Sequence, residues 1–430
     1  MFSGIVDLLY TQTADKSRTT PPVLGAVSKK VLESLPGECR RFRWIMRIGI
    51  DALFEDSTGT GGLTYLRNVI REIAIIGTQD QFFVFVRDDT SKLLDPGLPN
   101  IRVVPCRRRK GSIGRIFSQH CTLAYMVRKL NLEVLLCPGN VASIFTAILV
   151  VLVIQNRLQF TARVSEEYRL QPVGVIRTLY KDMIGRVSLR KAKVVLCVSR
   201  DVEEVLINAL GVPSSKIKVV YLGVDLKHFT NKLPLKTDRK NIPPPGYILG
   251  VGRLLPSKNH HTLIRAFARY CDSTGNGAER LVIVGNDFGG RKDYLLRLAF
   301  ELGVASRVSI LGFVPYDEMA DVYNCAALFV HLSHAESFCF PVIEAMACGV
   351  PFVASDVGGS KDLGKTHAGW LVEPESVPAL NCILKSILEN RAELKARGER
   401  GGEHVRRHYS WAASAERLER ILTSRLGVTQ

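Results

Sequence analysis

Two glutamates, Glu336 and Glu344, stand eight positions apart in the densest motif of the sequence. Glu336 follows the predicted strand 328–332, and Glu344 lies on the first turn of a helix that Pro341 suits as a start and Gly349 as an end. Open α/β sheets bind ligands at this carboxyl end of a strand. N–H groups at the helix start would hold phosphate or sugar oxygens, and the carboxylates would accept hydrogen bonds from hydroxyl groups. The motif indicates a site for such a ligand. The alternative is that Glu344 only interacts with the helix dipole and that Glu336 is a solvated loop residue.

A second motif offers two cations, Arg253 and Lys258, in the loop after the predicted strand 247–251. Arginine can grip a diphosphate with two hydrogen bonds, and lysine adds a point charge. Gly250 and Gly252 resemble part of a dinucleotide-binding turn, but the third glycine of that turn is missing, which disfavours a hydride-transfer enzyme. The motif predicts a diphosphate site, with ordinary surface cations as the alternative.

A third motif, residues 57–62, is rich in glycine and follows the first predicted strand. Gly61 and Gly62 would let the backbone approach a ligand closely and expose its N–H groups, although the same run fits a plain turn. No Gly-Lys-Ser/Thr follows, so the motif is not a Walker loop. Asp-x-Asp and HExxH are also missing, so we predict no metal, and we interpret His260 and His261 as a solvated helix start rather than as ligands.

Two parallel sheets are predicted to position these motifs. Short Val/Ile/Leu runs alternate with helical patterns, which is typical of parallel sheets covered by helices on both faces. The strands predicted in the first half are 46–51, 82–87, 101–105, 133–137, 148–154, 194–198 and 217–221, and the helices are 62–76, 114–131, 173–191 and 201–210. The strands predicted in the second half are 247–251, 280–284, 308–312, 328–332 and 351–354, and the helices are 260–270, 291–302, 316–325 and 341–348. The predicted fold class is α/β, with two Rossmann-like, doubly wound parallel-sheet domains facing a cleft.

A polar, proline-rich run at 232–246 separates the two halves. We therefore expect an N-terminal domain over 46–231, a C-terminal domain over 232–410 and a last helix over 411–430. Residues 1–45 look different from the rest and are interpreted as an extension, either dispensable or a membrane-surface element.

The charge of the chain is uneven. Its 430 residues include 58 Lys and Arg against 41 Asp and Glu, a net charge of +17, and residues 101–200 hold 18 of the basic and 4 of the acidic residues. This excess indicates an anionic partner, namely nucleic acid, an anionic membrane surface or a phosphorylated substrate, with a merely solvated face as the alternative. The basic residues do not interleave with aromatic residues as in a nucleic-acid-binding module, so nucleic acid is not an expected partner.

Composition limits the remaining classes. At 46% hydrophobic and 23% charged residues the chain is globular, not disordered or collagen-like. Its most apolar stretch, 141–154, is shorter than the about 20 residues that span a bilayer, and we interpret it as one or two buried strands. Most of the ten cysteines lie in apolar runs, which is typical of free thiols in a reducing cytosol. We expect a cytoplasmic protein, with peripheral membrane contact at most.

In this order and spacing the motifs resemble the retaining glycosyltransferases of the GT-B fold, specifically the GT4 family, from about Met46 onward. The pair Glu336 and Glu344 is similar to that family's E-x7-E element, and Arg253 and Lys258 to its diphosphate-binding cations. Gly61 and Gly62 resemble its glycine loop, and the helix from Trp411 looks like the one that crosses back onto the first domain.

The resemblance implies a role for each position. Arg253 and Lys258 would neutralise the diphosphate of a nucleotide sugar without a metal, and the catalytic set would be these two with Glu336. Glu344 would hold the ribose, Glu336 and the backbone at Phe338 and Cys339 would hold the sugar, and Val314 would lie by the base. The first domain would bind the acceptor, and transfer would proceed with retention by front-face attack.

Three departures from the family pattern stand out. Ser337 and Cys339 occupy places where glycine is usual, and their side chains would narrow the donor pocket. Gln155 and Asn156 stand where many members have a His-Asp pair, and glutamine offers a hydrogen bond but cannot titrate. Asp362 replaces a usual glutamate.

The leading hypothesis is therefore a retaining glycosyltransferase that uses a UDP- or GDP-linked sugar. Its acceptor would be a glycan or a lipid-linked glycan in bacterial-type surface polysaccharide synthesis. The alternatives are a non-catalytic member of the family and another GT-B enzyme such as a sugar-nucleotide epimerase.

Overall fold

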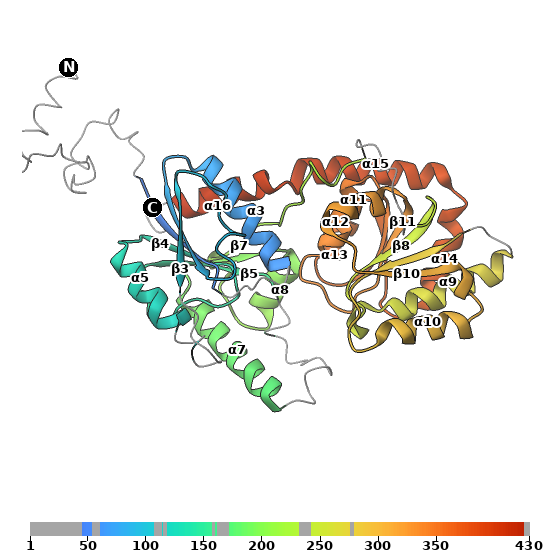
Figure 1. Cartoon of the computed structure of the whole chain (residues 1–430), viewed down its shortest axis with the longest axis horizontal. Coiled ribbons are helices and arrows are strands. Elements are labelled where there is room, and N and C mark those ends of the chain that lie inside the picture. The colour runs from blue at the N-terminus through green and yellow to red at the C-terminus, as the bar shows by residue number, and fades with distance from the viewer. Residues whose placement is uncertain are drawn as a thin grey trace, which may run out of the picture. The chain divides into compact units, whose positions relative to one another are not determined.

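The computed structural model describes residues 45–53, 61–106, 114, 118–156, 160, 172–231, 242–275 and 279–424. Two parallel sheets organise them (Figure 1). The first sheet has seven strands in the order β3-β2-β1-β4-β5-β6-β7, and the second has six in the order β10-β9-β8-β11-β12-β13. Every pair of neighbouring strands is parallel. The predicted fold class, two Rossmann-like α/β domains, is confirmed.

The first sheet and its helices comprise β1 (Arg47–Asp51), α3 (Gly61–Ile76), β2 (Gln81–Arg87), β3 (Ile101–Cys106), a π-helical turn (Ser118–Thr122), α5 (Leu123–Lys129), β4 (Val134–Cys137), β5 (Leu149–Ile154), α7 (Pro172–Lys191), β6 (Val194–Cys197), α8 (Arg200–Asn208) and β7 (Ile217–Val219). The central strands are apolar along their whole length and fully buried, as β4 shows. Parallel sheets covered on both faces require such runs, which is why their strands were predicted to within one or two residues.

The second sheet and its helices comprise β8 (Tyr247–Val251), the 3₁₀ turn η6 (Pro256–Lys258), α9 (His260–Thr274), β9 (Leu281–Val284), α10 (Arg291–Glu301), β10 (Val308–Gly312), α11 (Tyr316–Asn324), β11 (Ala326–His331), α12 (Phe340–Ala347), β12 (Phe352–Ser355), α13 (Ser360–Gly364), β13 (Gly369–Val372), α14 (Val377–Leu388), α15 (Arg391–His408) and α16 (Trp411–Thr423). Figure 1 shows α12 and α15 on one face of this sheet and α9 and α10 on the other.

The last helix of the described chain, α16, packs against α3 beside the first sheet. The ring centroids of Trp411 and Tyr65 lie 6.1 Å apart at this contact. A parallel bridge joins Val224, just after β7, to Ser410, and a Cβ at Gly223 would lie 2.4 Å from the backbone nitrogen of Trp411. The glycine thus permits a close backbone approach.

Two predictions in the first half are confirmed in outline, with different details. In the described part of the predicted helix 114–131, Ser118–Thr122 form a π-helical turn that continues into α5, so the segment is helical but not α-helical throughout. The stretch 141–154 was interpreted as one or two buried strands, and it contains one, Leu149–Ile154. The preceding carbonyls of Ile144 and Thr146 accept hydrogen bonds from Lys191 Nζ, so a side chain satisfies backbone groups that a strand would pair.

Residues 232–241 and all but the last of residues 1–45 lie outside the described part of the chain, so the predicted linker and extension are not assessed there. No helix among the described residues is long and apolar enough to cross a membrane.

Candidate functional site

The motifs of the second half meet where the strand order of the second sheet reverses. β8 pairs with β9 on one side and with β11 on the other, and the loops after β8 and β11 carry Lys258 and Glu336. The space outside the carboxyl ends of strands at such a switch point is where open α/β sheets bind ligands. The topology therefore places both predicted motifs at a binding edge.

Glycines hold the loop after β8 against the loop after β9. Gly252 has φ +153, and its N–H donates to the carbonyl of Val284 at 2.9 Å. A Cβ at Gly285 would lie 1.8 Å from the carbonyl oxygen of Gly252, so only glycine fits there. This contact fixes the backbone from which the exposed Arg253 extends.

Glu336 is the centre of a charged cluster. Its Oε1 accepts a hydrogen bond from Lys258 Nζ and lies 2.9 Å from His331 Nε2. His331 ends β11 and is 3% exposed. The predicted pair of Lys258 and Glu336 is thus in direct contact, together with a histidine that sequence reasoning missed. Its only signal was a histidine at the end of an otherwise apolar strand.

The two cations set the ionisation of this cluster. Burial raises the pKa of Glu336, but Lys258 and His331 outweigh it and hold the pKa well below its usual range. Burial alone would lower the pKa of His331. Cys339 and Glu336 raise this pKa by more than burial lowers it, and the result is a pKa of about 9. At neutral pH the cluster therefore holds a carboxylate between an ammonium and an imidazolium.

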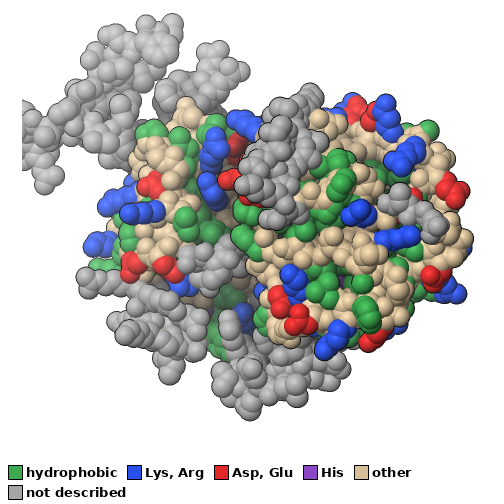
Figure 2. Space-filling model, turned by 45° about the vertical axis from the view of Figure 1, so that its right-hand side comes forward, with side chains coloured by type: hydrophobic (Ala, Val, Ile, Leu, Met, Phe, Trp, Pro, Cys, Tyr) green, Lys and Arg blue, Asp and Glu red, His purple; other side chains and the backbone are tan. Residues whose placement is uncertain are grey.

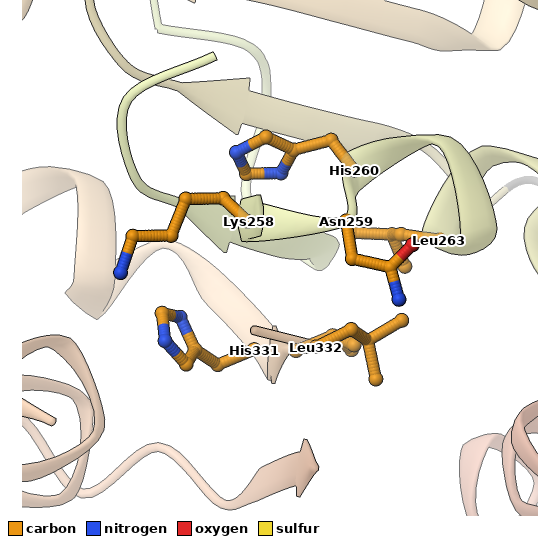
Figure 3. A pocket seen from close by; sticks show the side chains of 7 residues that line it. Lys258, Asn259, His260, Leu263, His331 and Leu332 are labelled. Carbon is orange, nitrogen blue, oxygen red and sulfur yellow. The ribbon is translucent and has the colours of Figure 1, made fainter. Parts of the chain in front are cut away.

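A narrow crevice runs beside this cluster and is lined by Lys258, Asn259, His260, Leu263, Val330, His331 and Leu332 (Figure 3). Figure 3 shows that the side chains of Lys258 and His331 extend to the same side. The interpretation of His260 as solvated was wrong: it is 6% exposed, and its Nε2 lies 3.1 Å from the carbonyl oxygen of Gly252. Burial lowers its pKa to about 4, so His260 is neutral and donates to that carbonyl. Its neighbour His261 is half-buried.

Glu344 lies on α12, as predicted, and is separate from the charged cluster. The Tyr323 hydroxyl donates a hydrogen bond to its Oε2 at 2.8 Å. Burial raises the pKa of Glu344 to about 7, although the Tyr323 hydrogen bond lowers it in part. This carboxylate can therefore change its protonation state near neutral pH.

The loop before α12 is tightly built. Cys339, the residue before the helix, has φ 91 and ψ 64, a left-handed conformation that is sterically costly for any residue except glycine. A Cβ at Gly358 would lie 1.7 Å from the carbonyl oxygen of Glu336, and one at Gly359 would lie 2.4 Å from that of Phe338. Glycine would adopt the conformation of Cys339 without this steric cost.

The N-terminal candidates lie at strand and helix ends of the first sheet. Gly61 and Gly62 begin α3, and a Cβ at Gly61 would lie 3.6 Å from the ring of Phe340, the first residue of α12. Residues 57–60 lie outside the described part of the chain. Gln155 follows β5; its N–H donates to Asn140 Oδ1 at 2.8 Å, and its buried Nε2 meets no partner among the described residues.

The remaining candidates are dispersed. Val314 follows β10 and is half-buried. Within the described chain, no hydrogen bond or ion pair joins Arg253, Gln155 or Val314 to the glutamates. Asp362 Oδ2 accepts from the N–H of Arg200 at 2.9 Å, so this carboxylate sits at the start of α8 rather than in the cluster. The described residues hold no group of three or more His, Cys, Asp and Glu side chains arranged to bind a metal.

Two family models match the chain. The model of glycosyl transferases group 1 matches residues 236–424, and that of glycosyltransferase family 4 matches residues 59–228. The chain belongs to the GT4-like glycosyltransferases. The cluster of Lys258, His331 and Glu336 thus lies in the part of the chain that the group 1 model matches, and Gly61, Gly62 and Gln155 lie in the part that the family 4 model matches.

Curated relatives agree with this assignment, and solved structures share the fold. The D-inositol 3-phosphate glycosyltransferase of Nocardia farcinica is 33% identical over 219 residues, which are 50% of this chain and 48% of the relative. The alignment spans about half the length of such relatives. Sucrose-phosphate synthase from Thermosynechococcus elongatus has a similar fold, with TM-score 0.67, 20% identity and coverage of 87% of this chain and 98% of that one. Anabaena HepE in complex with UDP-glucose has TM-score 0.66, 19% identity and coverage of 88% and 100%.

Proposed function

We propose that this chain transfers a sugar from a nucleoside diphosphate sugar to a glycan or lipid-linked acceptor, with retention and without a metal. The observation that carries the proposal is the contact between Lys258 and Glu336 at the switch point of the second sheet, beside the exposed Arg253. Cations suit a diphosphate, and an ionised carboxylate suits sugar hydroxyl groups. The site therefore offers complementary charges for the two parts of such a donor.

In this proposal residues 232–410 bind the donor. Arg253 and Lys258 hold the diphosphate, Glu336 and the backbone at Phe338 and Cys339 hold the sugar, and Glu344 accepts hydrogen bonds from the ribose. Val314 lies by the base, and Gln155, Gly61 and Gly62 face the donor from the first domain. The similar fold of Anabaena HepE, whose structure contains UDP-glucose, supports a nucleotide-sugar donor.

The reaction breaks the bond between the anomeric carbon and the diphosphate oxygen, and it forms a bond from that carbon to the acceptor oxygen on the same face of the sugar. The acceptor proton passes to the departing phosphate. Negative charge grows on the diphosphate as the bond breaks, and Arg253 and Lys258 stabilise it there.

Residues 46–231 are proposed to bind the acceptor, with 411–430 completing that domain. An exposed apolar stripe on α7, formed by Leu179, Met183 and Val187 at every fourth position, supports contact with a lipid surface. Leu179 is 65% exposed and Met183 57% exposed, and basic side chains such as Arg190 stand exposed on the same helix. Figure 2 shows Lys and Arg side chains at many points of one face of the molecule. We propose peripheral binding to an anionic membrane at its inner face, during synthesis of a surface polysaccharide.

A second acceptor class follows from the relatives. Several relatives are D-inositol 3-phosphate glycosyltransferases, and that of Nocardia farcinica is 33% identical over about half of its length. A small phosphorylated acceptor also suits the basic excess of residues 101–200.

The donor proposal is tested by thermal shift with UDP, GDP, ADP and their sugars, without added metal. Binding raises the melting temperature by mass action. We expect one nucleotide family to raise the melting temperature of the wild type. Arg253→Ala and Glu344→Ala should abolish this rise. Arg265→Ala, which removes an exposed arginine of α9, should retain it. A folded protein that responds to none of these ligands would overturn the proposal and favour a non-catalytic family member.

Acceptor and membrane are tested separately. With the identified donor, mass spectrometry of products distinguishes a lipid-linked glycan acceptor from inositol phosphate. Co-sedimentation with phosphatidylglycerol vesicles should fall in Leu179→Ser with Met183→Ser and stay unchanged in Leu296→Ser, which alters a leucine of α10 that is 39% exposed. Binding that does not depend on anionic lipid or salt would refute the membrane proposal.

A further inference from the structure

His331 is a buried side chain of the charged cluster to which the proposed reaction assigns no task. Its Nε2 approaches the same carboxylate oxygen, Glu336 Oε1, that accepts from Lys258. Within the described chain neither cation contacts Oε2. The carboxylate is therefore held from one side by two cations, which leaves its other oxygen for a sugar hydroxyl group.

A diphosphate would compete for one of these cations. Lys258 donates to Glu336, and an ammonium group that turns its N–H donors toward a diphosphate gives up part of that contact. Without His331, the Glu336 carboxylate, which is 15% exposed, would then have no second cation beside it and would be driven toward the neutral form, because burial disfavours charge. A protonated Glu336 would be a weaker acceptor for sugar hydroxyl groups, because hydrogen bonds to an ionised carboxylate are the stronger ones.

We propose that His331 is a positioning residue that keeps Glu336 ionised and oriented when the diphosphate of a nucleoside diphosphate sugar draws Lys258 away. The inference rests on the proposed function. In this inference Lys258 moves from Glu336 toward the diphosphate, and His331 keeps its contact with Glu336.

The surroundings of His331 suit this task. The titratable and charged groups that face its ring are Lys258 from η6, His260 from the start of α9, and Glu336 and Cys339 from the loop before α12. On β11 itself the ring stacks on Phe329, with centroids 6.0 Å apart. Because the pKa of His260 is about 4, that neighbour stays neutral while His331, with a pKa of about 9, carries a charge.

The test compares the binding of a nucleotide with that of its sugar conjugate. Calorimetric titrations use UDP with UDP-glucose and GDP with GDP-mannose, on the wild type, His331→Phe and His331→Gln. We expect the Kd for the nucleotide sugar to rise about tenfold in His331→Phe relative to the Kd for the nucleotide, the size expected for loss of a hydrogen bond to a charged group. His331→Gln keeps a hydrogen-bond donor, so it should bind the nucleotide sugar more tightly than His331→Phe does. Glutamine does not titrate, so this variant should lack the loss of affinity that we expect of the wild type above about pH 9. His120→Phe, which alters a histidine of the first domain that is 3% exposed, is the matched control.

The outcomes separate the two proposals. If the wild type binds neither nucleotide nor nucleotide sugar, the proposed function fails, and the inference fails with it. If the wild type binds both and His331→Phe keeps the wild-type ratio of the two Kd values, only the inference fails. An NMR titration gives a readout without ligand: the His331 ring should titrate above pH 8 in the wild type and at lower pH in Glu336→Gln. A wild-type ring that is neutral at pH 7 would overturn the inference.

Discussion

Glu344→Gln should make the protein more stable above neutral pH. Burial raises the pKa of Glu344 from its ordinary value of 4.5 to about 7. Because the folded state binds this proton more tightly than the unfolded chain, the carboxyl stabilises the fold most below pH 4.5, and that contribution is lost as pH rises through 7. A shift of this size corresponds to a loss of at most about 3 kcal/mol, of which about 2 kcal/mol falls between pH 5.5 and 8. Glutamine keeps the size of the side chain and carries no charge at any of these pH values.

The assay is urea denaturation of wild type and variant at pH 5.5 and pH 8, followed by tryptophan fluorescence. The free energy of unfolding of the wild type should fall by about 2 kcal/mol more than that of Glu344→Gln between these pH values. Asp51, whose pKa burial also raises to about 7, titrates in both proteins and cancels in the comparison. The control is Glu204→Gln, which alters an exposed glutamate of α8 and should follow the wild type. Equal losses in wild type and Glu344→Gln would refute the reasoning, because Glu344 would then not be buried as a costly charge.

Three further changes test other contacts. Lys258→Met should raise the Kd for the nucleoside diphosphate about tenfold or more in calorimetry, because it removes a charge-assisted contact; unchanged affinity would place the diphosphate elsewhere. Cys339→Gly should be more stable than Cys339→Ala by about 1 kcal/mol in urea denaturation, because glycine adopts the observed φ of 91 without steric cost; the reverse order would show that the left-handed conformation is not strained. Asp362→Ala should lower the free energy of unfolding by about 1 kcal/mol, since the carboxylate accepts from the first N–H of α8; Asp356→Ala, an exposed aspartate nearby, is its control, and equal effects would refute a specific contact.

The strands could be predicted from the sequence because a parallel sheet buried on both faces requires strands that are apolar at every position. Runs such as Val134–Cys137 and Leu149–Ile154 are apolar at every position, and helices separate them. The sequence analysis predicted no element between 355 and 410, where α13, β13, α14 and α15 lie. α15 contains Gly398, Gly401 and Gly402, and glycine has a low intrinsic propensity for the interior of a helix. Packing overrides that preference: a Cβ at Gly398 would lie 2.0 Å from the carbonyl oxygen of Gly349.

The site could be predicted only as far as local sequence reaches. Lys258 and Glu336 were recognised because each follows a strand in a motif with helix signals, and the sheet order brings them together. The partners His331, Tyr323 and Arg200 could not be found in this way, because each meets its carboxylate through the fold. Asp362 was interpreted as the replacement of a usual glutamate, and nothing in its neighbourhood along the chain indicates that it meets the start of α8.

The hydrogen bond between Lys258 and Glu336 affects how the affinity for a donor should depend on ionic strength. When a free cation captures a phosphate, a new ion pair forms, and added salt weakens binding by screening it. Here Lys258 already has an anionic partner, so the proposed capture exchanges one ion pair for another. The exposed Arg253 alone would form a new pair. Donor affinity should therefore respond to salt as if the site held one cation, although two are proposed to contact the diphosphate.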